Sequence, residues 1–264
     1  MEKLKIAVTT IGTDAVNESR IRSICEDPVV LDLCTTIVYE KEEALCELSK
    51  GNVNALVLYP STESVKRPVE SIEFIVTDKT IFIPIRKEPS IEEIVQFRDI
   101  LERDFDIHSP RVAIVLEGNM QNPDFANQVT TEQGINTYGP YTLEQILAED
   151  AINHFDCIVI IGDSVLEQHI IAGLSQDAPV RFFANTGTVI TSTYHPVLMK
   201  EEEEGVTDIS ELTHPIYIAI DVIRNRILYD KARQNPLPKL FRDKRDDRKK
   251  DDVSQNKLNS QNEE

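Results

Sequence analysis

The stretch CIVIIGDSVLEQHIIAG, residues 157–173, passes from an apolar run through a polar triplet into a segment with helical spacing. Such an apolar run is typical of a strand that is buried on both faces of a sheet, as the strands of parallel sheets are. The triplet Gly162-Asp163-Ser164 then follows at the carboxyl end of that strand, the edge where α/β proteins bind ligands. The stretch therefore predicts an α/β fold and places Asp163 and Ser164 at a candidate active-site edge.

Strands and helices alternate along the chain on both sides of this stretch. Such alternation predicts a mainly parallel sheet with helices on both of its faces. Two apolar runs within 72–85 surround a polar Thr-Asp-Lys turn and predict an antiparallel hairpin, an insertion that either extends the sheet or builds a subunit interface. The other strands are expected at 4–12, 35–40, 54–60, 111–118, 156–163, 180–185 and 188–195, and the helices at 17–26, 41–52, 89–105, 142–151, 164–173 and 208–234.

Several helix ends carry sequence signals. A capping box, in which Ser or Thr precedes Glu or Gln by three residues, predicts a helix start. Gly51 is expected to close the helix at 41–52, and Pro215 to break or restart the C-terminal helical region. The predicted boxes pair Ser90 with Glu93, Thr142 with Gln145 and Ser164 with Glu167, and Asn17 is the expected cap of the helix at 17–26.

The charge of the chain is strongly negative and unevenly spread. The net charge is −18, while the last 29 residues hold eight basic and seven acidic side chains, so that residues 1–235 carry about −19. An acidic body repels phosphate backbones, which excludes nucleic acid as a partner of the folded part. We expect residues 1–235 to form the α/β region, two lobes around a cleft, and residues 236–264 to form a disordered charged tail.

No run approaches the ~20 apolar residues that a membrane helix needs, and the N-terminus enters a strand at once instead of a signal peptide. We therefore expect a cytoplasmic protein without a membrane partner. The cysteines at 25, 34, 46 and 157 have no close-paired spacing and lie in or beside apolar patterns. They are expected to be buried reduced thiols, not disulfides or a zinc site.

Familiar catalytic motifs are absent from the sequence. No Gly-x-Gly-x-x-Gly occurs, and GINTYGP at 134–140 has the glycine spacing of a phosphate loop but Pro140 in place of its lysine. A helix start near Asn17 could still hold a phosphate. No Gly-x-Ser-x-Gly supports a serine hydrolase, and no two histidines have the i, i+4 spacing of a metal site in one helix.

Asp163 and His195 are the candidate catalytic residues, with Ser164 beside them. His195 closes a predicted strand at a carboxyl edge, and a carboxylate there could act as a base or a metal ligand. The alternative for the triplet is purely structural, because Ser164 and Glu167 have capping-box spacing. The alternative for His195 is a histidine at the surface.

The order of three segments resembles the 4-hydroxythreonine-4-phosphate dehydrogenase family of vitamin B6 biosynthesis over residues 4–232. The segments are GINTYGPYTLEQIL from 134, HFDCIVIIGDS from 154 and TGTVITSTYHPVL from 186, followed by a long C-terminal helix. The resemblance implies the two-lobed fold of isocitrate and isopropylmalate dehydrogenases and a homodimer. It also implies an NAD-dependent oxidation with a divalent metal that three histidines from both subunits bind.

Few functional residues of that family are found at matching positions of this sequence. The family's His-Asp-Gln falls on 162–164, where the aspartate remains and the histidine is Gly162. Its Asn-Pro-His-Ala-Gly-Glu loop falls on 117–125 without a histidine, and its Gly-Pro-Val-His-Lys loop falls on 59–63, where only Pro60 matches. Its Ser-Val-Asp-His-Gly stretch keeps the histidine as His195.

We therefore expect no metal site and no bound cofactor, with NAD and a divalent metal only if the family site survives. The first hypothesis is a non-catalytic or regulatory homologue that forms a homodimer or pairs with an active relative. The second is an active oxidoreductase with an altered substrate, centred on Asp163 and His195. The third is a sensor that binds a small-molecule ligand.

Overall fold

A computed structural model describes residues 3–11, 21–60, 68, 71–116, 124–148, 151–163, 167–168, 170–171, 179–184, 187–194 and 209–235. The chain divides into two compact units, Met1–Tyr229 and Asp230–Glu264, and the whole sheet lies in the first unit. The predicted tail at 236–264 and the predicted cap Asn17 lie outside the described residues.

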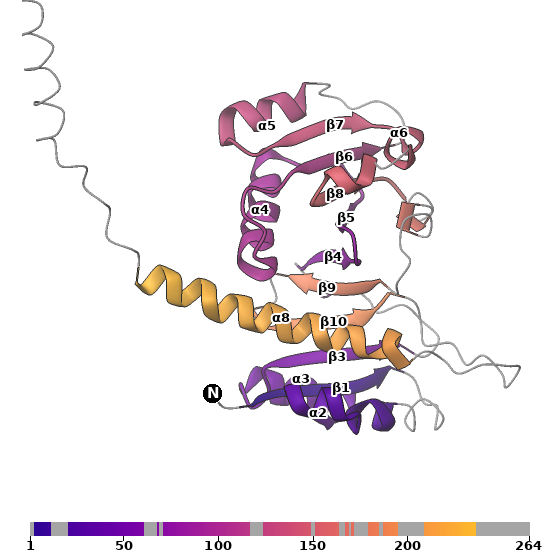
Figure 1. The fold of residues 1–264 in the computed structure, drawn as a ribbon, viewed down its shortest axis with the longest axis vertical. Helices are drawn as coiled ribbons and strands as arrows, with labels where there is room; N and C mark the ends of the chain where they lie inside the picture. The colour runs from indigo at the N-terminus through magenta and orange to yellow at the C-terminus, as the bar shows by residue number, and fades with distance from the viewer. Residues whose placement is uncertain are drawn as a thin grey trace, which may run out of the picture. The chain divides into compact units, whose positions relative to one another are not determined.

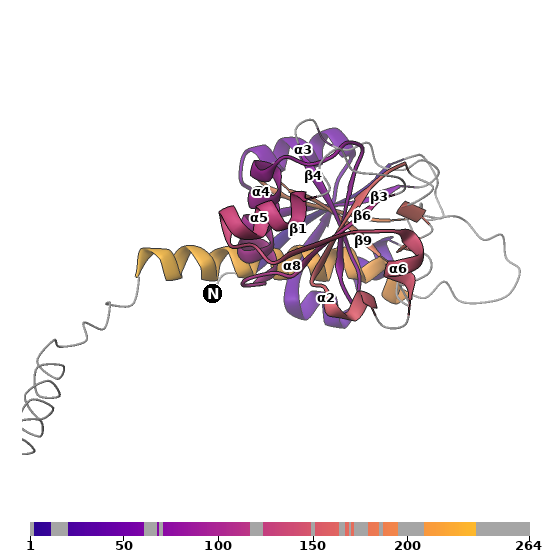
Figure 2. The same cartoon turned by 90° about the horizontal axis from the view of Figure 1, so that it is seen from above.

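The first unit is built on one ten-stranded sheet with the order β2-β1-β3-β10-β9-β4-β5-β8-β6-β7 (Figure 1). Seen from above, the strands fan out with the twist of the sheet (Figure 2). The strands are β1 Leu4–Ile11, β2 Cys34–Val38, β3 Ala55–Pro60, β4 Ile72–Val76, β5 Ile81–Ile85, β6 Val112–Leu116, β7 Thr137–Tyr141, β8 Cys157–Ile161, β9 Val180–Ala184 and β10 Val189–Thr193.

Two parallel groups of strands form the ends of the sheet. β1, β2, β3 and β10 are parallel to one another, and so are β5, β6, β7 and β8. Between them, β9 is antiparallel to β10 and β4, and β4 is antiparallel to β5. The two groups therefore run in opposite directions. The predicted mixed, mainly parallel sheet is confirmed, and the predicted hairpin at 72–85 is its central link.

The helices cover both faces of the sheet, as predicted. On one face α2, α4, α5 and α8 share a continuous core with the strands, whose centre includes Phe74, Phe97 and Phe182. On the other face α3 covers one group of strands, while α6, η1 and residues 170–171 cover the other. The helices are α2 Pro28–Leu33, α3 Lys41–Ser49, α4 Ile91–Phe105, α5 Phe125–Gln133, α6 Leu143–Leu147, the 3₁₀ helix η1 Ala151–His154 and α8 Ile209–Gln234, and residues 21–25 are helical too.

The capping boxes at α4 and α6 are confirmed. The Ser90 hydroxyl accepts a hydrogen bond from the Glu93 amide at 3.2 Å, and the Glu93 carboxylate accepts one from the Ser90 amide at 2.7 Å. Thr142 and Gln145 make the same reciprocal pair. Local side-chain chemistry thus sets these two helix starts.

Pro215 does not break the C-terminal helix, and that prediction was wrong. α8 runs through it without interruption. Pro215 is the seventh residue of α8, past the first turn, so its ring removes the amide that would donate to the carbonyl of residue 211. Its carbonyl oxygen accepts a hydrogen bond from the Thr191 hydroxyl of β10 at 2.8 Å, which ties this turn to the sheet.

The cysteines are free thiols, as predicted, but they are not all buried. Cys34 and Cys157 are buried, Cys25 is half-buried, and Cys46 is exposed on α3. Cys46 therefore lies on the outer side of its helix, which the apolar neighbours in sequence did not reveal. Within the described residues, no helix combines the length and the apolar character that a membrane crossing requires.

Candidate functional site

A cluster of charged and polar side chains lies on the face of the sheet opposite α8. We call it the polar cluster: Glu73 of β4, Arg86 after β5, Glu167 after β8, Arg181 of β9 and Tyr194 after β10. Glu73 and Arg181 alternate along their strands with Phe74 and Phe182, which belong to the core on the α8 side. The cluster therefore joins the two parallel groups of strands across the antiparallel strands between them.

Glu167 is the centre of this cluster. Its carboxylate accepts a hydrogen bond from the Tyr194 hydroxyl at 3.0 Å, and its other oxygen lies 3.4 Å from Nη2 of Arg86. Nη1 of Arg86 donates to the carbonyl oxygen of Gly162 at 2.7 Å. Glu167 is only 9% exposed, so its charge depends on these partners instead of water.

Glu73 and Arg181 form a second, deeper ion pair. Nε of Arg181 lies 2.5 Å from the Glu73 carboxylate, and both side chains are 11% exposed. The Arg181 guanidinium also lies over the Phe183 ring, 5.4 Å from its centre, at cation–π distance. A charged pair is thus built into strands that are otherwise apolar.

Burial and neighbouring charges shift the pKa values of Glu167 and Tyr194 in this cluster. Burial raises the pKa of this carboxyl group, and the charge of Glu73 raises it further. The hydrogen bond from Tyr194 and the charges of Arg86 and Arg181 oppose that rise without cancelling it. Burial and the nearby Glu167 carboxylate also raise the pKa of the Tyr194 hydroxyl. Burial is thus the main cause of both shifts, and the Tyr194 hydroxyl is the donor to the Glu167 carboxylate.

The described part of the chain covers only some of the residues predicted for the site. Asp163 lies two residues after the end of β8 and is exposed, and its carbonyl accepts a hydrogen bond from the Glu167 amide at 3.3 Å. Ser164 and His195 lie outside the described residues, so a joint role of Asp163 and His195 stays a prediction. Their strands, β8 and β10, run in opposite directions with β9, β4 and β5 between them.

The structure nevertheless brings these two segments together through their neighbours. Glu167 lies four residues after Asp163, and Tyr194 directly precedes His195, and these two side chains are hydrogen-bonded. The sequence predicted Glu167 only as a capping residue, and it did not single out Tyr194, Arg86, Glu73 or Arg181. A signal was present, because Glu73 and Arg181 place opposite charges inside the apolar runs IEFIV and VRFFA.

The residues at the end of β8 are a poor fit for a divalent metal ion. Gly162 offers a carbonyl oxygen but no side chain, and the Arg86 guanidinium already donates to that oxygen. Because the positively charged guanidinium lies 2.7 Å from this oxygen, it repels a metal ion that approaches the same oxygen. Within the part of the chain that the structure describes, no three histidine, cysteine or acidic side chains are arranged to hold a metal.

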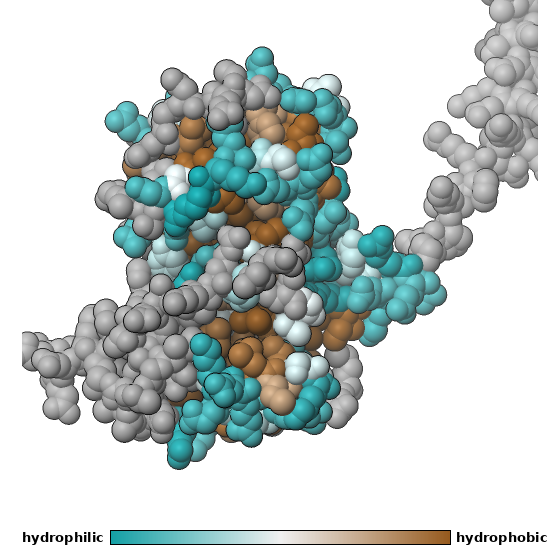
Figure 3. Space-filling view, turned by 180° about the vertical axis from the view of Figure 1, so that it is seen from behind, coloured by the Kyte–Doolittle hydropathy of each residue, from teal (hydrophilic) through white to brown (hydrophobic). Residues whose placement is uncertain are grey.

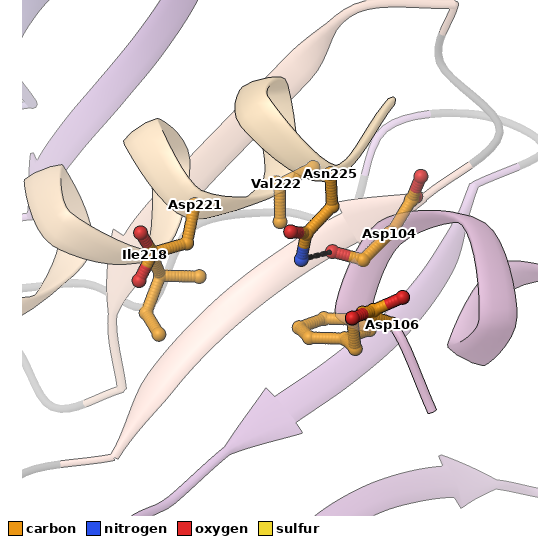
Figure 4. A pocket seen from close by; sticks show the side chains of 7 residues that line it. Asp104, Asp106, Ile218, Asp221, Val222 and Asn225 are labelled. Atoms are coloured by element: carbon orange, nitrogen blue, oxygen red, sulfur yellow. Dashed lines mark hydrogen bonds between the residues drawn. The ribbon is translucent and has the colours of Figure 1, made fainter. Parts of the chain in front are cut away.

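A separate cavity of about 370 Å³ lies between the end of α4 and α8 (Figure 4). Phe105, Ile218 and Val222 supply its apolar lining, and Asp104, Asp106, Asp221 and Asn225 its polar lining. The carboxylate of Asp104 is fully buried and pairs with Arg226 at 2.8 Å and with Arg103 at 2.7 Å. The Asn225 amide donates to the Asp104 carbonyl at 3.0 Å. These contacts clamp α4 to α8.

No family model matches the sequence. The chain is similar to the 4-hydroxythreonine-4-phosphate dehydrogenase of Bacteroides thetaiotaomicron, with 31% identity over 220 residues that cover 76% of this chain and 57% of the relative. The chain thus spans little more than half the length of this curated relative.

Solved structures of two further enzymes with that name share the fold. The enzyme of Burkholderia phymatum aligns with a TM-score of 0.54 and 13% identity, over 83% of this chain and 98% of the other. The enzyme of Klebsiella pneumoniae aligns with a TM-score of 0.53 and 13% identity, over 84% and 98%. At this identity the likeness shows that the chain shares the fold of these enzymes, and the division into two lobes stays a prediction.

Proposed function

We propose that this chain, a shorter homologue of 4-hydroxythreonine-4-phosphate dehydrogenase, is non-catalytic and regulatory and pairs with an active relative. The observation that carries the proposal is the contact between Arg86 and Gly162. Gly162 stands where the resemblance places a histidine that binds the metal, and an arginine occupies the space beside it. The site thus contains a fixed positive charge in place of a metal ligand.

The charges around the site support the same proposal. Residues 1–235 carry about −19, which disfavours the approach of NAD and of a phosphorylated substrate, both of which are anions. The two arginines of the polar cluster, both in the described part of the chain, are engaged in pairs: Arg86 with Glu167 and Arg181 with Glu73. The polar cluster is therefore neutralised internally and does not present a free cationic anchor for a phosphate.

A partner protein would bury exposed apolar side chains of this chain. Seen from behind, hydrophobic residues reach the surface among hydrophilic ones (Figure 3). Apolar area of this kind can be buried in an interface. In the described part of the chain, the large apolar side chains that are at least 40% exposed are Val29, Leu31, Val38, Leu45, Tyr138, Leu147 and Leu228.

The first test is a thermal-unfolding titration of the purified chain with Mg²⁺, Mn²⁺ or Zn²⁺, with NAD, and with both. A ligand at a hundredfold excess over its dissociation constant stabilises its protein by ~2.7 kcal/mol, which such a titration detects. We expect no shift for this chain and a clear shift for the Bacteroides thetaiotaomicron enzyme as the positive control. A shift with metal and NAD together would contradict a non-catalytic site.

The second test examines the pairing. The chain is mixed with an active relative from the same organism, and native mass spectrometry identifies the complexes. We expect a one-to-one pair and a changed rate of the relative. A mixture that contains only the two separate homodimers, with the rate unchanged, would reject the regulatory role while leaving the non-catalytic site intact.

A further inference from the structure

Two oxygen atoms from adjacent parts of the chain converge on one guanidinium group in the polar cluster. The carbonyl oxygen of Gly162 lies at the end of β8, and the carboxylate of Glu167 lies in the helical residues that follow. Arg86, at the end of the neighbouring strand β5, contacts both, at 2.7 and 3.4 Å. The two oxygens are thus held around a positive charge that comes from a third segment.

We infer that Arg86 is a built-in cation, which occupies the place that a divalent metal ion would take between the Gly162 carbonyl and the Glu167 carboxylate. Carbonyl and carboxylate oxygens are the donors that hard divalent cations such as Mg²⁺ and Mn²⁺ prefer. The guanidinium satisfies the same oxygens with hydrogen bonds, and its charge excludes a second cation. This inference rests on the proposed function, because both treat the site beside Gly162 in the wild-type chain as closed to a metal ion.

The shape of arginine explains why this residue suits the role. Its planar fork presents several donors in fixed directions, so one group can serve a carbonyl and a carboxylate together. In the structure, Nη1 donates to the Gly162 carbonyl and Nη2 donates to the Glu167 carboxylate. Lysine has a single ammonium group on a flexible stem and would hold the two oxygens less firmly.

The position of Arg86 makes the inference testable without unfolding the protein. Its side chain is 60% exposed, so its truncation leaves the core unchanged. The neighbouring Lys87 offers a matched control, because its side chain is 78% exposed and pairs with Glu93 instead. Arg86→Met and Lys87→Met change the net charge equally and differ only in the site that loses its cation.

The experiment compares the binding of Mn²⁺ to the full-length wild type, Arg86→Met and Lys87→Met by electron paramagnetic resonance, which counts free Mn²⁺, and by thermal unfolding. We expect Arg86→Met to gain a saturable site, on the order of tenfold tighter or more than any site in the other two proteins, because like-charge repulsion is removed. The double variant Arg86→Met with Glu167→Gln should lose that gain.

Two results would overturn the inference. One is Mn²⁺ binding by Arg86→Met that is no tighter than binding by Lys87→Met. The other is a wild-type Mn²⁺ site that Glu167→Gln abolishes, since the native oxygens would then be open to metal. These results are separable from a failure of the proposed function, because regulatory pairing is measured on the wild type without added metal, and metal binding needs no substrate.

Discussion

Two buried carboxyl groups, Asp104 and Glu167, have pKa shifts of opposite sign because their partners differ. Burial raises the pKa of Asp104, but the hydrogen bonds and charges of Arg226 and Arg103 outweigh it, so the pKa lies below 3.8. For Glu167, burial is the largest effect and the nearby Glu73 charge adds to it. The charges of Arg86 and Arg181 lower the pKa by less, so the pKa of Glu167 rises. At the residue scale, the contacts with arginine partners decide the direction of each pKa shift.

Replacement of Asp104 by Asn should strongly destabilise the first unit. The change leaves Arg226 and Arg103 without their buried counter-ion, a loss on the order of 3–5 kcal/mol. Because the folded-state pKa is depressed, this contribution is present above the ordinary aspartate pKa of 3.8 and disappears as the pH falls through the lower folded-state value. Urea unfolding of both proteins should therefore show a gap at pH 7 that narrows on acidification. A gap independent of pH would count against the ion pair.

Replacement of Tyr194 by Phe tests the hydrogen bond at the centre of the polar cluster. The change removes the donor to a buried Glu167 oxygen, so the free energy of unfolding should fall by about 1–3 kcal/mol. Tyr138→Phe is the control, since Tyr138 is 42% exposed and its loss should lie within about 0.5 kcal/mol of zero. Equal effects of the two substitutions in chemical denaturation would show that the contact contributes nothing.

The contacts between individual side chains were the features that the sequence predicted least well. Asp163 was placed correctly at the end of a strand, but its neighbours in space were not foreseen. Arg86 and Tyr194 each follow a different strand and meet Glu167 only because the strand order places them so. A sequence pattern records which residues end a strand, but not which strands are neighbours.

Elements with strong local signals were predicted well, and elements without them were missed. The capping boxes of α4 and α6 and the apolar runs of the hairpin act over a few residues, and all appear in the structure. α5 was missed because its sequence is polar and its cap, Asp124, makes no side-chain capping bond. β7 was missed because Gly139 and Pro140 favour a turn, although an edge strand tolerates proline.

The capping box of α4 should contribute measurably to stability. Ser90→Ala should lower the free energy of unfolding by about 1 kcal/mol, because it leaves the Glu93 amide without its acceptor. Glu93→Ala removes the reciprocal bond, and the double variant should lose less than the sum of the two single variants, since the bonds support each other. Strictly additive losses in guanidinium unfolding would show that the two bonds act independently.

Gly139 should tolerate a side chain much less well than Gly51. Both residues have positive φ angles, but a Cβ atom on Gly139 would lie 2.7 Å from the Ile114 carbonyl oxygen, whereas one on Gly51 meets nothing within 4 Å. Gly139→Ala must therefore push β7 away from β6, in addition to the backbone strain that both variants share. We expect a clearly lower melting temperature for Gly139→Ala than for Gly51→Ala, and equal melting temperatures would refute the contact.

For the whole molecule, the sequence predicted the class of fold but not its central arrangement. Alternating strands and helices indicated a mainly parallel sheet, which the structure confirms. The opposite directions of the two parallel groups follow from three successive antiparallel pairings, β10–β9, β9–β4 and β4–β5, and the sequence left open whether the β4–β5 hairpin was central or peripheral. Its position brings the segments after β8 and β10 together across the sheet, and this creates the polar cluster.

The most direct measurement of the central claim is a turnover assay of the full chain. Purified protein is incubated with 4-hydroxythreonine 4-phosphate, NAD and Mg²⁺, Mn²⁺ or Zn²⁺, and NADH is followed by its absorbance, with the Bacteroides thetaiotaomicron enzyme as the positive control. A non-catalytic homologue whose site is filled by Arg86 predicts no NADH above the protein-free background. Sustained NADH formation that requires the metal, and that Asp163→Ala abolishes, would contradict the account.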